Sequence, residues 1–505
     1  ASWNESSATA HWRQRGNKAQ PFFSVFNLMT SHQSRSMVWP YARFKKEVQS
    51  TLPPGAIHYP AKVPVPPYYP DTPLIRRELA RFYDCVSAMD LQVGAILKQL
   101  EEDGLAENTI VFFYSDHGSG IPRHKRALLD SGMHVPLLIR FPKKWQHLAP
   151  GKPSSTTDRL VSFVDYAPTV LNLLGHPLPK AMQGEPFLGP DAAAPRRYVY
   201  GHRDRVDEVR DLARSVRDRR YLYIRNYMPH LGYNQPTAWP DNGEIRHEFY
   251  RLAKREKMTD AQWHFAGPTR PIEELYDCQT DPQNLKNLAG SKAHQKILKR
   301  LRNAHRKHIR DTVDLGFLPE SEAWEMFAQK TGWELGQSGQ VKMGAIHRAA
   351  AQVGTADEAT LAQNLTSKSA SIRYWAALGL VQRNALKIET KKLLRKALTD
   401  ESPAVRIEAA NTLAHHGDSA RAVQALIKDL AHENLIIATH AARTIELLGE
   451  TALTAKAPMA AALKRAETIR PPNTPATVVL PGDKDLAMFV AFSCRAFLSK
   501  FDTYD

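Results

Sequence analysis

The sequence contains little cysteine and no long apolar run. Its three cysteines in 505 residues lie far apart without metal-type spacing, so we expect ordinary buried or free thiols. No apolar stretch approaches the roughly 18 residues that a membrane helix needs, so we expect no membrane span. The first residues, Ala1 to Glu5, include no initiator methionine, charged leader or apolar leader core. Such a start is typical of the interior of a longer protein.

Charge is abundant and unbalanced, with a formal net charge of +16. Between Arg196 and Arg225, ten arginines stand against five acidic residues. A basic face can attract nucleic acid, an acidic membrane or an anionic glycan, although a solvated charge run is the commoner explanation. No nucleic-acid motif accompanies the charge, so we expect no nucleic-acid partner. The length and the 43% hydrophobic content predict about two to four folded domains.

An island of charge lies between two apolar runs, residues 109–114 and 135–141. The runs have the β-branched and aromatic content of buried parallel strands. Asp116 and His117 follow the first run, where open α/β sheets place their ligands. A carboxylate beside an imidazole can bind a divalent cation, and the nearby Lys125 suits an oxyanion such as sulfate or phosphate. As an isolated tripeptide, Asp-His-Gly is more often a turn beside a solvated basic loop.

The wider spacing is more specific than the tripeptide. Ser-Asp-His-Gly ends the first run, Lys125 follows, and an Asp-Ser-Gly triplet and Val-Pro lead into the second run. This pattern resembles the second half of the active site of the sulfatase family, within the alkaline-phosphatase superfamily. The resemblance implies that Asp116 and His117 ligate Ca²⁺ and that Lys125 contacts the sulfate. It also makes the flanking residues His124 and Arg126 candidates for binding substrate.

A further apolar run, residues 21–28, predicts a strand that ends near His32. A lone histidine after a strand is usually structural. The position resembles that of the sulfatase histidine at the leaving-group oxygen, so the resemblance implies that His32 is a catalytic acid or a sulfate ligand. Between these segments, residues 74–100 carry apolar side chains at helical spacing and predict a long core helix.

Short strand-like runs follow residue 197 and predict a small antiparallel subdomain. His202, Arg205 and Glu208 lie between the first two of these runs, in a position where sulfatases often recognise the sugar. The resemblance therefore implies that they bind substrate. A surface ion-pair cluster would have the same appearance in the sequence.

An internal repeat marks the C-terminal third of the chain. Leu365, Leu398 and Leu430 correspond at steps of 33 and 32 residues, and a pair of alanines follows each of them at a constant distance. The order of helix, polar turn and helix resembles HEAT repeats, which stack into a solenoid. A plain helical bundle need not show three units in register. The resemblance implies a possible protein or glycan partner for the repeats.

Together these patterns predict an α/β fold: a partial sulfatase-type core with a small antiparallel C-terminal subdomain, followed by an all-α HEAT-like solenoid. The predicted boundaries are the core at 1–190, the subdomain at 191–315, a connector at 316–344, the repeats at 345–468, and a linker with a terminal helix at 469–505.

Two features of the sulfatase pattern are missing. Sulfatases carry an early Asp-Asp pair and a Cys- or Ser-x-Pro-x-Arg motif whose first residue becomes formylglycine, the covalent nucleophile. This chain contains neither. We therefore expect an N-terminally truncated sulfatase of the bacterial heparan N-sulfatase type. Formylglycine is expected in the missing segment, and the chain by itself is expected to be inactive.

The resemblance implies a hydrolase of sulfuric esters or N-sulfates on sulfated glycans such as glycosaminoglycans. It also implies one Ca²⁺ as cofactor and a periplasmic or secreted location. Two alternatives stay open. One is a phosphodiesterase or phosphatase of the same superfamily, which usually binds two metals through more Asp and His ligands. The other is a HEAT-repeat interaction scaffold with an inactive sulfatase-like domain.

Overall fold

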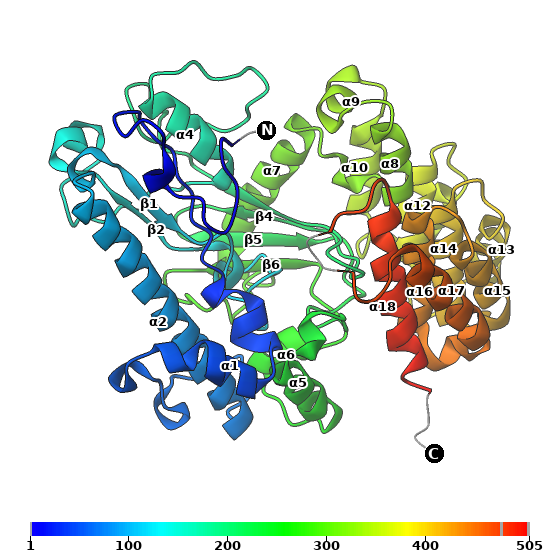
Figure 1. Cartoon of the computed structure of the whole chain (residues 1–505). Helices are drawn as coiled ribbons and strands as arrows, with labels where there is room; N and C mark the ends of the chain where they lie inside the picture. Colours follow the sequence, from blue (N-terminus) through cyan, green and yellow to red (C-terminus); the bar gives the residue numbers. More distant parts are fainter. Residues whose placement is uncertain (1–2, 475–477, 502–505) are drawn as a thin grey trace.

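The computed structural model describes residues 3–474 and 478–501, so the predicted terminal segment at 469–505 lies partly outside the described residues. An α/β region with two antiparallel sheets lies beside a region of stacked helices near the C-terminus (Figure 1). Within the described part of the chain, no helix is both long enough and apolar enough to cross a membrane.

The longest helix, α2 (Pro73–Glu102), lies where apolar spacing predicts a core helix. Its start is fixed by Thr72, whose side chain accepts a hydrogen bond from the Ile75 amide, and by proline at the first helical position. It ends before Gly104, which adopts the left-handed conformation that glycine tolerates. The short helix α1 (Tyr41–Glu47) packs on α2 through one shared apolar cluster.

The two runs around the charged island form an antiparallel pair, β1 (Val111–Tyr114) and β2 (Leu137–Arg140). The expectation of buried parallel strands is wrong, and Leu138 is 59% exposed. Residues 21–28, predicted as a further strand, form no ladder, and Phe23 is 63% exposed. Apolar runs become buried strands only when neighbouring strands pair with them. Within the described residues, β1 and β2 pair only with each other.

Two short helices accompany this pair. Helix α3 (Asp130–Met133) ends the loop after β1, and helix α4 (Tyr166–Leu173) follows β2. The buried Asp165 precedes α4, closes a capping box with Ser162 and pairs with Arg196. These contacts fix the entry into α4.

The second sheet has four strands in the order β3 (Val199–Arg203), β4 (Ala213–Arg217), β5 (Tyr221–Asn226) and β6 (Glu273–Asp277), and each neighbouring pair is antiparallel. One face packs on helix α7 (Gln295–Asp311), and the opposite face packs on residues 127–129 of the loop that carries the charged island. Helices α5 (Glu244–Lys254) and α6 (Asp260–Ala266) lie in the connection from β5 to β6. The charged loop is thus held against one face of the four-stranded sheet.

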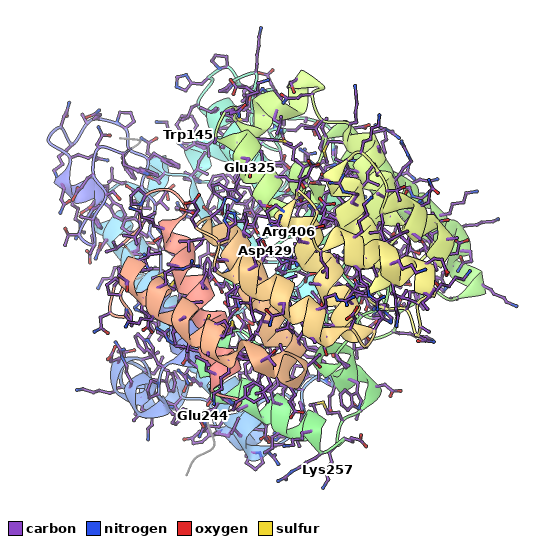
Figure 2. All side chains as sticks on the ribbon, turned by 90° about the vertical axis from the view of Figure 1, so that its right-hand side faces the viewer. Trp145, Glu244, Lys257, Glu325, Arg406 and Asp429 are labelled. Carbon is purple, nitrogen blue, oxygen red and sulfur yellow. The ribbon has the colours of Figure 1, made fainter. Side chains whose placement is uncertain are left out.

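The helical region contains three predicted helix pairs, which are α11 (Glu358–Asn364) with α12 (Ala370–Leu380), α13 (Ile388–Ala397) with α14 (Pro403–His415), and α15 (Ser419–Leu430) with α16 (Leu435–Leu448). The repeated alanine pairs are at most 1% exposed and lie on α12, α14 and α16, which pack in series. Small side chains at these positions let the helices approach closely. Ion pairs repeat as well, since Arg373 pairs with Asp400. Arg406 pairs in the same way with Asp429, and Figure 2 shows where these two residues lie on the stack.

Further helices connect and close this stack. Helices α8 (Glu320–Phe327), α9 (Gly332–Ser338) and α10 (Met343–Ala351) lead from the second sheet to the first pair. After the last pair, α17 (Lys456–Ile469) packs on α18 (Ala487–Leu498), which also packs on α16 (Figure 1). The apolar core of the stack continues into the α/β region through Leu212, Tyr227 and Met228.

Candidate functional site

The charged island leaves β1 as a tight loop, and two glycines permit its close contacts. A Cβ on Gly118 would lie 2.0 Å from the carbonyl oxygen of Ser131. A Cβ on Gly120 would lie 2.6 Å from the Cα of Gln33, and the carbonyl of Gly120 accepts a hydrogen bond from Nε2 of Gln33 at 2.8 Å. Because Gln33 is the neighbour of His32, this contact joins the His32 segment to the charged loop.

Asp116 and His117 lie side by side after β1, with Oδ2 of Asp116 3.5 Å from Nε2 of His117. Nδ1 of His117 donates to the carbonyl of Gly118 at 2.6 Å, so in the neutral ring Nε2 keeps its lone pair. The side chain of Asp116 is 82% exposed and that of His117 is 31% exposed. Both donor atoms are therefore open to a cation rather than committed to the core.

Lys125 follows on the same loop, where its amide donates to the carbonyl of Ser119 at 2.9 Å. Within the described residues, no hydrogen bond or ion pair engages its ammonium group. Burial and the charge of Arg126 lower the pKa of Lys125, whereas Asp116 raises it. A half-buried ammonium group without a protein partner is suited to bind an anion.

His32 lies close to these residues although no strand precedes it. Its Nδ1 accepts a hydrogen bond from the Ser34 amide at 3.2 Å, so in the neutral ring Nε2 carries the proton. Burial and the charge of Lys125 lower the pKa of His32, and Asp116 acts in the opposite direction. The predicted catalytic and metal-binding residues thus share one electrostatic neighbourhood: His32, Asp116, His117 and Lys125.

His124 lies in the core of the loop rather than on its surface. Its Nε2 is 3.0 Å from the Tyr68 hydroxyl and its Nδ1 is 2.7 Å from the Ser119 hydroxyl. Burial, with a smaller effect of Arg123, lowers the pKa of His124 to about 4. Because protein groups occupy both ring nitrogens, His124 supports the loop and has no nitrogen left for a ligand.

The three candidates after β3 contact other elements of the fold. Arg205 pairs with both carboxylate oxygens of Glu320 on α8, at 2.7 Å from each. Glu208 is 2% exposed and accepts a hydrogen bond from the Ala238 amide at 2.6 Å. His202 lies beside His308 of α7, with ring centroids 5.8 Å apart. None of the three lines the space beside Lys125.

A cleft that the sequence patterns do not reveal opens beside Lys125. It is a shallow cleft with an internal volume of about 50 Å³, is open to solvent, and is lined by the charged loop, by Arg203 at the end of β3 and by residues from Tyr233 to Pro240. The lining contains five cationic side chains and only the carboxylate of Asp211. These residues come from separate segments without a shared motif, so only the fold brings them together.

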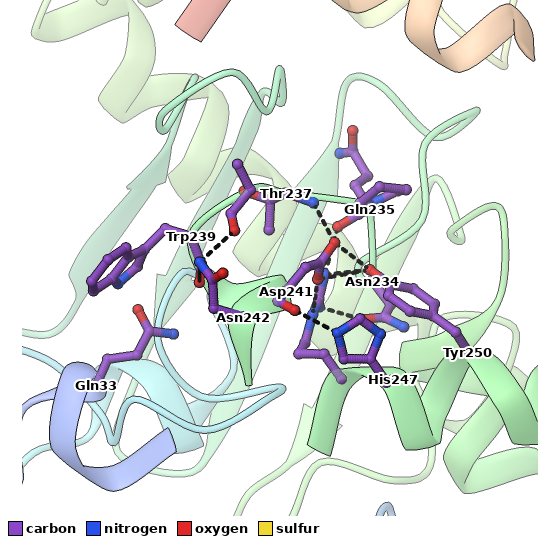
Figure 3. A network of polar contacts seen from close by, with 12 residues as sticks. Gln33, Asn234, Gln235, Thr237, Trp239, Asp241, Asn242, His247 and Tyr250 are labelled. Atoms are coloured by element: carbon purple, nitrogen blue, oxygen red, sulfur yellow. Dashed lines mark hydrogen bonds and ion pairs between the residues drawn. The ribbon is translucent and has the colours of Figure 1, made fainter. Parts of the chain in front are cut away.

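One wall of the cleft is the segment 233–242, called the wall loop below (Figure 3). Asp241 accepts hydrogen bonds from the Thr237 amide at 2.9 Å and from Nε of Arg246 at 2.8 Å. Arg246 also donates to the carbonyl of Gln235 at 2.7 Å. Since Arg246 belongs to α5, this network fixes the wall loop on a helix.

Asp116 and His117 fit part of a divalent-cation site. A carboxylate oxygen and an imidazole nitrogen are acceptable ligands, and the two side chains lie close enough to share one ion. Residues 3–474 and 478–501 contain no cluster of three or more His, Cys, Asp or Glu side chains that could hold a metal ion, at this site or elsewhere. The pair supplies only part of the shell of Ca²⁺, which takes about six to eight ligands.

Comparison with known families assigns both regions of the chain. Residues 8–176 match the family model for sulfatases, and residues 122–233 match the model described as N-sulphoglucosamine sulphohydrolase, C-terminal. Residues 358–462 match the model for HEAT repeats. The α/β region is therefore sulfatase-like and the helical region is HEAT-like, which confirms the fold class and the family predicted from the residue patterns.

Individual relatives match parts of the chain. An ulvan-active sulfatase of Formosa agariphila is 39% identical over 347 residues, which cover 63% of this chain and 56% of that protein. Human N-sulphoglucosamine sulphohydrolase is 27% identical over 290 residues, or 50% of this chain and 52% of that protein. The crystal structure of a putative sulfatase from Bacteroides thetaiotaomicron aligns over 52% of each chain with 22% identity and a TM-score of 0.35. The chain spans about half the length of the curated relatives it matches.

Proposed function

We propose that this chain belongs to a hydrolase that removes sulfate from sulfated glycans, as sulfuric esters or N-sulfates. The observation that carries the proposal is the unpaired ammonium group of Lys125 in the same neighbourhood as Asp116, His117 and His32. Hydrolysis of a sulfate group needs positive charge at the sulfate oxygens and a proton for the leaving atom. These four side chains offer both.

Each residue has a definite role in the proposed reaction. Lys125 donates hydrogen bonds to the sulfate oxygens and stabilises the charge that builds on them. His32, when protonated, gives its Nε2 proton to the leaving oxygen or nitrogen, while the Nδ1 proton is donated to the Ser34 hydroxyl, 2.9 Å away. Asp116 and His117 hold one Ca²⁺, which polarises the sulfate when bound.

The nucleophile is the formylglycine of the sulfatase family and belongs to a segment upstream of this chain. In this proposal the chain alone binds Ca²⁺ weakly and turns over no sulfate, because it supplies two metal ligands and no nucleophile. The names of two matched relatives, an ulvan-active sulfatase and an N-sulphoglucosamine sulphohydrolase, support a sulfated saccharide as the substrate. We place the protein in the periplasm or outside the cell, where it meets such polymers.

The test is sulfate release by the whole protein that carries this chain, on sulfated oligosaccharides and on a small aryl sulfate. We expect hydrolysis that requires Ca²⁺ and formylglycine, with a preference for the oligosaccharides that shrinks as salt screens the net charge of +16. Sulfate release by the chain alone would contradict the upstream nucleophile. Hydrolysis of a matched aryl phosphate in place of the aryl sulfate would assign the protein to a phosphatase branch, and hydrolysis of neither substrate would favour the interaction scaffold.

A further inference from the structure

The chain forms one turn of π-helix, Ser34–Val38, directly after His32. The amide of Trp39 donates to the carbonyl of Ser34 at 2.7 Å, five residues back. Turns of this kind are rare and often lie at functional sites. This turn also holds His32 directly, because the amide of Ser36 donates to the carbonyl of His32 at 3.1 Å. The place of His32 therefore depends on the turn.

The backbone cannot supply every donor that the turn needs. In the same pattern the carbonyl of Arg35 would take the amide of residue 40, but residue 40 is proline and has no N–H group. A buried backbone carbonyl without a donor is unfavourable, and Met37 in this turn is only 1% exposed. The end of the turn therefore needs hydrogen-bond donors from another element.

Arg81 of α2 supplies these donors. Its Nε donates to the carbonyl of Arg35 at 2.7 Å, and its Nη2 donates to the carbonyl of Trp39 at 2.8 Å. Its Nη1 donates to the carbonyl of Met37 at 3.3 Å. One guanidinium group thus holds three alternate carbonyls at the end of the turn. This use depends on the planar fork of donors that arginine has and lysine lacks.

The burial of Arg81 indicates a role beyond filling space. Arg81 is 1% exposed and its partner Glu78 is fully buried, with Nη1 and Oε2 3.2 Å apart. A buried ion pair is often no more stable than apolar side chains of similar volume. The three carbonyl contacts are what an apolar residue could not provide. Arg77 lies beside the same carboxylate at 2.8 Å, but within the described residues it donates to none of these carbonyls.

The ring of His32 depends on the same turn. Its Nδ1 lies 2.9 Å from the hydroxyl of Ser34, the first residue of the turn. Nη1 of Arg35 donates to that hydroxyl at 3.1 Å, which orients it. If the turn unwound, Ser34 would move and Nδ1 would lose its partner, so the ring could rotate and change its tautomer. The turn thus keeps the ring in the orientation that a proton donor needs.

We propose that Arg81 is a positioning residue for His32: it holds the turn Ser34–Val38, and the turn holds the ring that protonates the leaving group. The inference rests on the proposed function, in which His32 is the acid. Arg81 contacts neither substrate nor cation in this account, so its effect on the reaction passes through His32.

Hydrogen exchange of the chain tests the structural step. Arg81→Lys keeps a positive charge beside Glu78, but one ammonium group cannot hold three carbonyls in the geometry of the guanidinium fork. The amides of residues 34–39 are expected to exchange at least about tenfold faster in this variant. Arg77→Lys makes the same change one turn earlier on α2 and is expected to leave their exchange unchanged. Equal exchange in the wild type and in Arg81→Lys would overturn the inference.

Two aryl sulfates test the effect on the reaction, with the whole protein that carries this chain. Phenyl sulfate has a poor leaving group that needs a proton, whereas 4-nitrophenyl sulfate has a better one that depends little on an acid. Arg81→Lys is expected to lower kcat for phenyl sulfate about ten- to a hundredfold, and kcat for 4-nitrophenyl sulfate by less than about threefold. Arg77→Lys should retain both rates. Equal losses on the two substrates in Arg81→Lys would assign Arg81 to the fold alone and overturn the inference.

His32→Gln separates this inference from the proposed function. If His32 is the acid, His32→Gln shows the same selective loss, and Arg81→Lys adds no further loss in that background. A loss in His32→Gln that is absent, or equal on both substrates, would refute the acid role in the proposed function. A selective loss in His32→Gln, combined with an additive effect of Arg81→Lys, would overturn the positioning role alone.

A second variant covers the case in which Arg81→Lys does not fold. Arg81→Met combined with Glu78→Gln removes both buried charges and keeps similar side-chain volumes. This double variant is expected to show the same faster exchange at residues 34–39 and the same selective loss on phenyl sulfate. If it does not fold either, Arg81 serves the fold as a whole and the inference is overturned.

Discussion

Arg443 of α16 donates a hydrogen bond from Nη2 to the carbonyl oxygen of Pro236 in the wall loop, at 2.8 Å. The same nitrogen lies 3.3 Å from Oε1 of Gln235. Nη1 of Arg443 is held by Glu446 at 2.7 Å, and both members of this pair are 1% exposed. A helix of the HEAT-like region therefore contacts the wall of the cleft in the sulfatase-like region and helps to fix its shape.

This relationship predicts a stability effect across the two regions. Arg443→Met is expected to lower the free energy of unfolding by about 3–5 kcal/mol, because it leaves Glu446 as a buried charge without its partner. The double variant Arg443→Met with Glu446→Gln removes that charge and is expected to regain part of the loss. Denaturant unfolding followed by circular dichroism measures both. A single variant as stable as the wild type would contradict the structural role of the pair.

Asp116 is expected to contribute its charge to cation binding. Asp116→Asn keeps the shape of the side chain but removes the negative charge, so Ca²⁺ affinity should fall by about tenfold or more. Asp158→Asn is the matched control, since Asp158 is also an exposed acid and lies outside the site. Calorimetric titration of the chain with Ca²⁺ makes the comparison. Equal affinities for the two variants would remove Asp116 from the metal site.

Gly120 is expected to be essential for the contact between the charged loop and the His32 segment. In Gly120→Ala the new Cβ meets the backbone of Gln33 at 2.6 Å, so the two segments must move apart. The variant should therefore bind a sulfated disaccharide more weakly. Gly94→Ala on α2 is the control, because no atom lies within 4 Å of its Cβ position and the helix should gain about 0.5–1 kcal/mol. Calorimetric titration of both variants with the sulfated disaccharide, and their denaturant unfolding, test the contact. Equal disaccharide affinities and equal stabilities of the two variants would refute it.

His124 is expected to make stability depend on pH. The pKa of His124 is about 4 in the folded state, whereas its ordinary value is about 6.5. Its contribution to the free energy of unfolding is therefore present above pH 6.5 and is lost as the pH falls toward 4. His124→Gln should therefore reduce the drop in unfolding free energy between pH 7 and pH 5 by about 2 kcal/mol. Denaturant titrations at the two pH values measure this. An identical drop in variant and wild type would show that folding does not lower the pKa of His124.

Local sequence spacing predicted the parts of the molecule that depend on neighbours along the chain. Asp116, His117 and Lys125 belong to one loop between two apolar runs, so their common neighbourhood could be predicted. The repeats could be predicted because each unit packs on the next with the same leucine and alanine positions. The role of the HEAT-like region toward an external protein or glycan stays a prediction, while its contact through Arg443 lies within the chain.

Features that depend on distant segments could not be predicted from spacing. The cleft needs Arg203, the wall loop and Gln33 together, and no motif links these positions. The strands around the charged island were expected to be buried and parallel because their composition fits that class, but strand direction is set by the partner. His124 and Lys125 are neighbours in the sequence, and both were predicted to contact the substrate. Only the contact of the His124 ring with the Tyr68 hydroxyl shows that His124 belongs to the core of the loop.

Turnover by the whole protein that carries this chain shows whether Lys125 acts on the sulfate group. Sulfate release from a sulfated oligosaccharide is measured for the wild type, for Lys125→Ala, and for Lys98→Ala, whose side chain is 75% exposed on α2. We predict that kcat falls by about 10²–10³-fold in Lys125→Ala, because one preorganised contact to the developing charge is lost, and that Lys98→Ala is unchanged. Wild-type turnover in Lys125→Ala would show that Lys125 does not stabilise the developing charge.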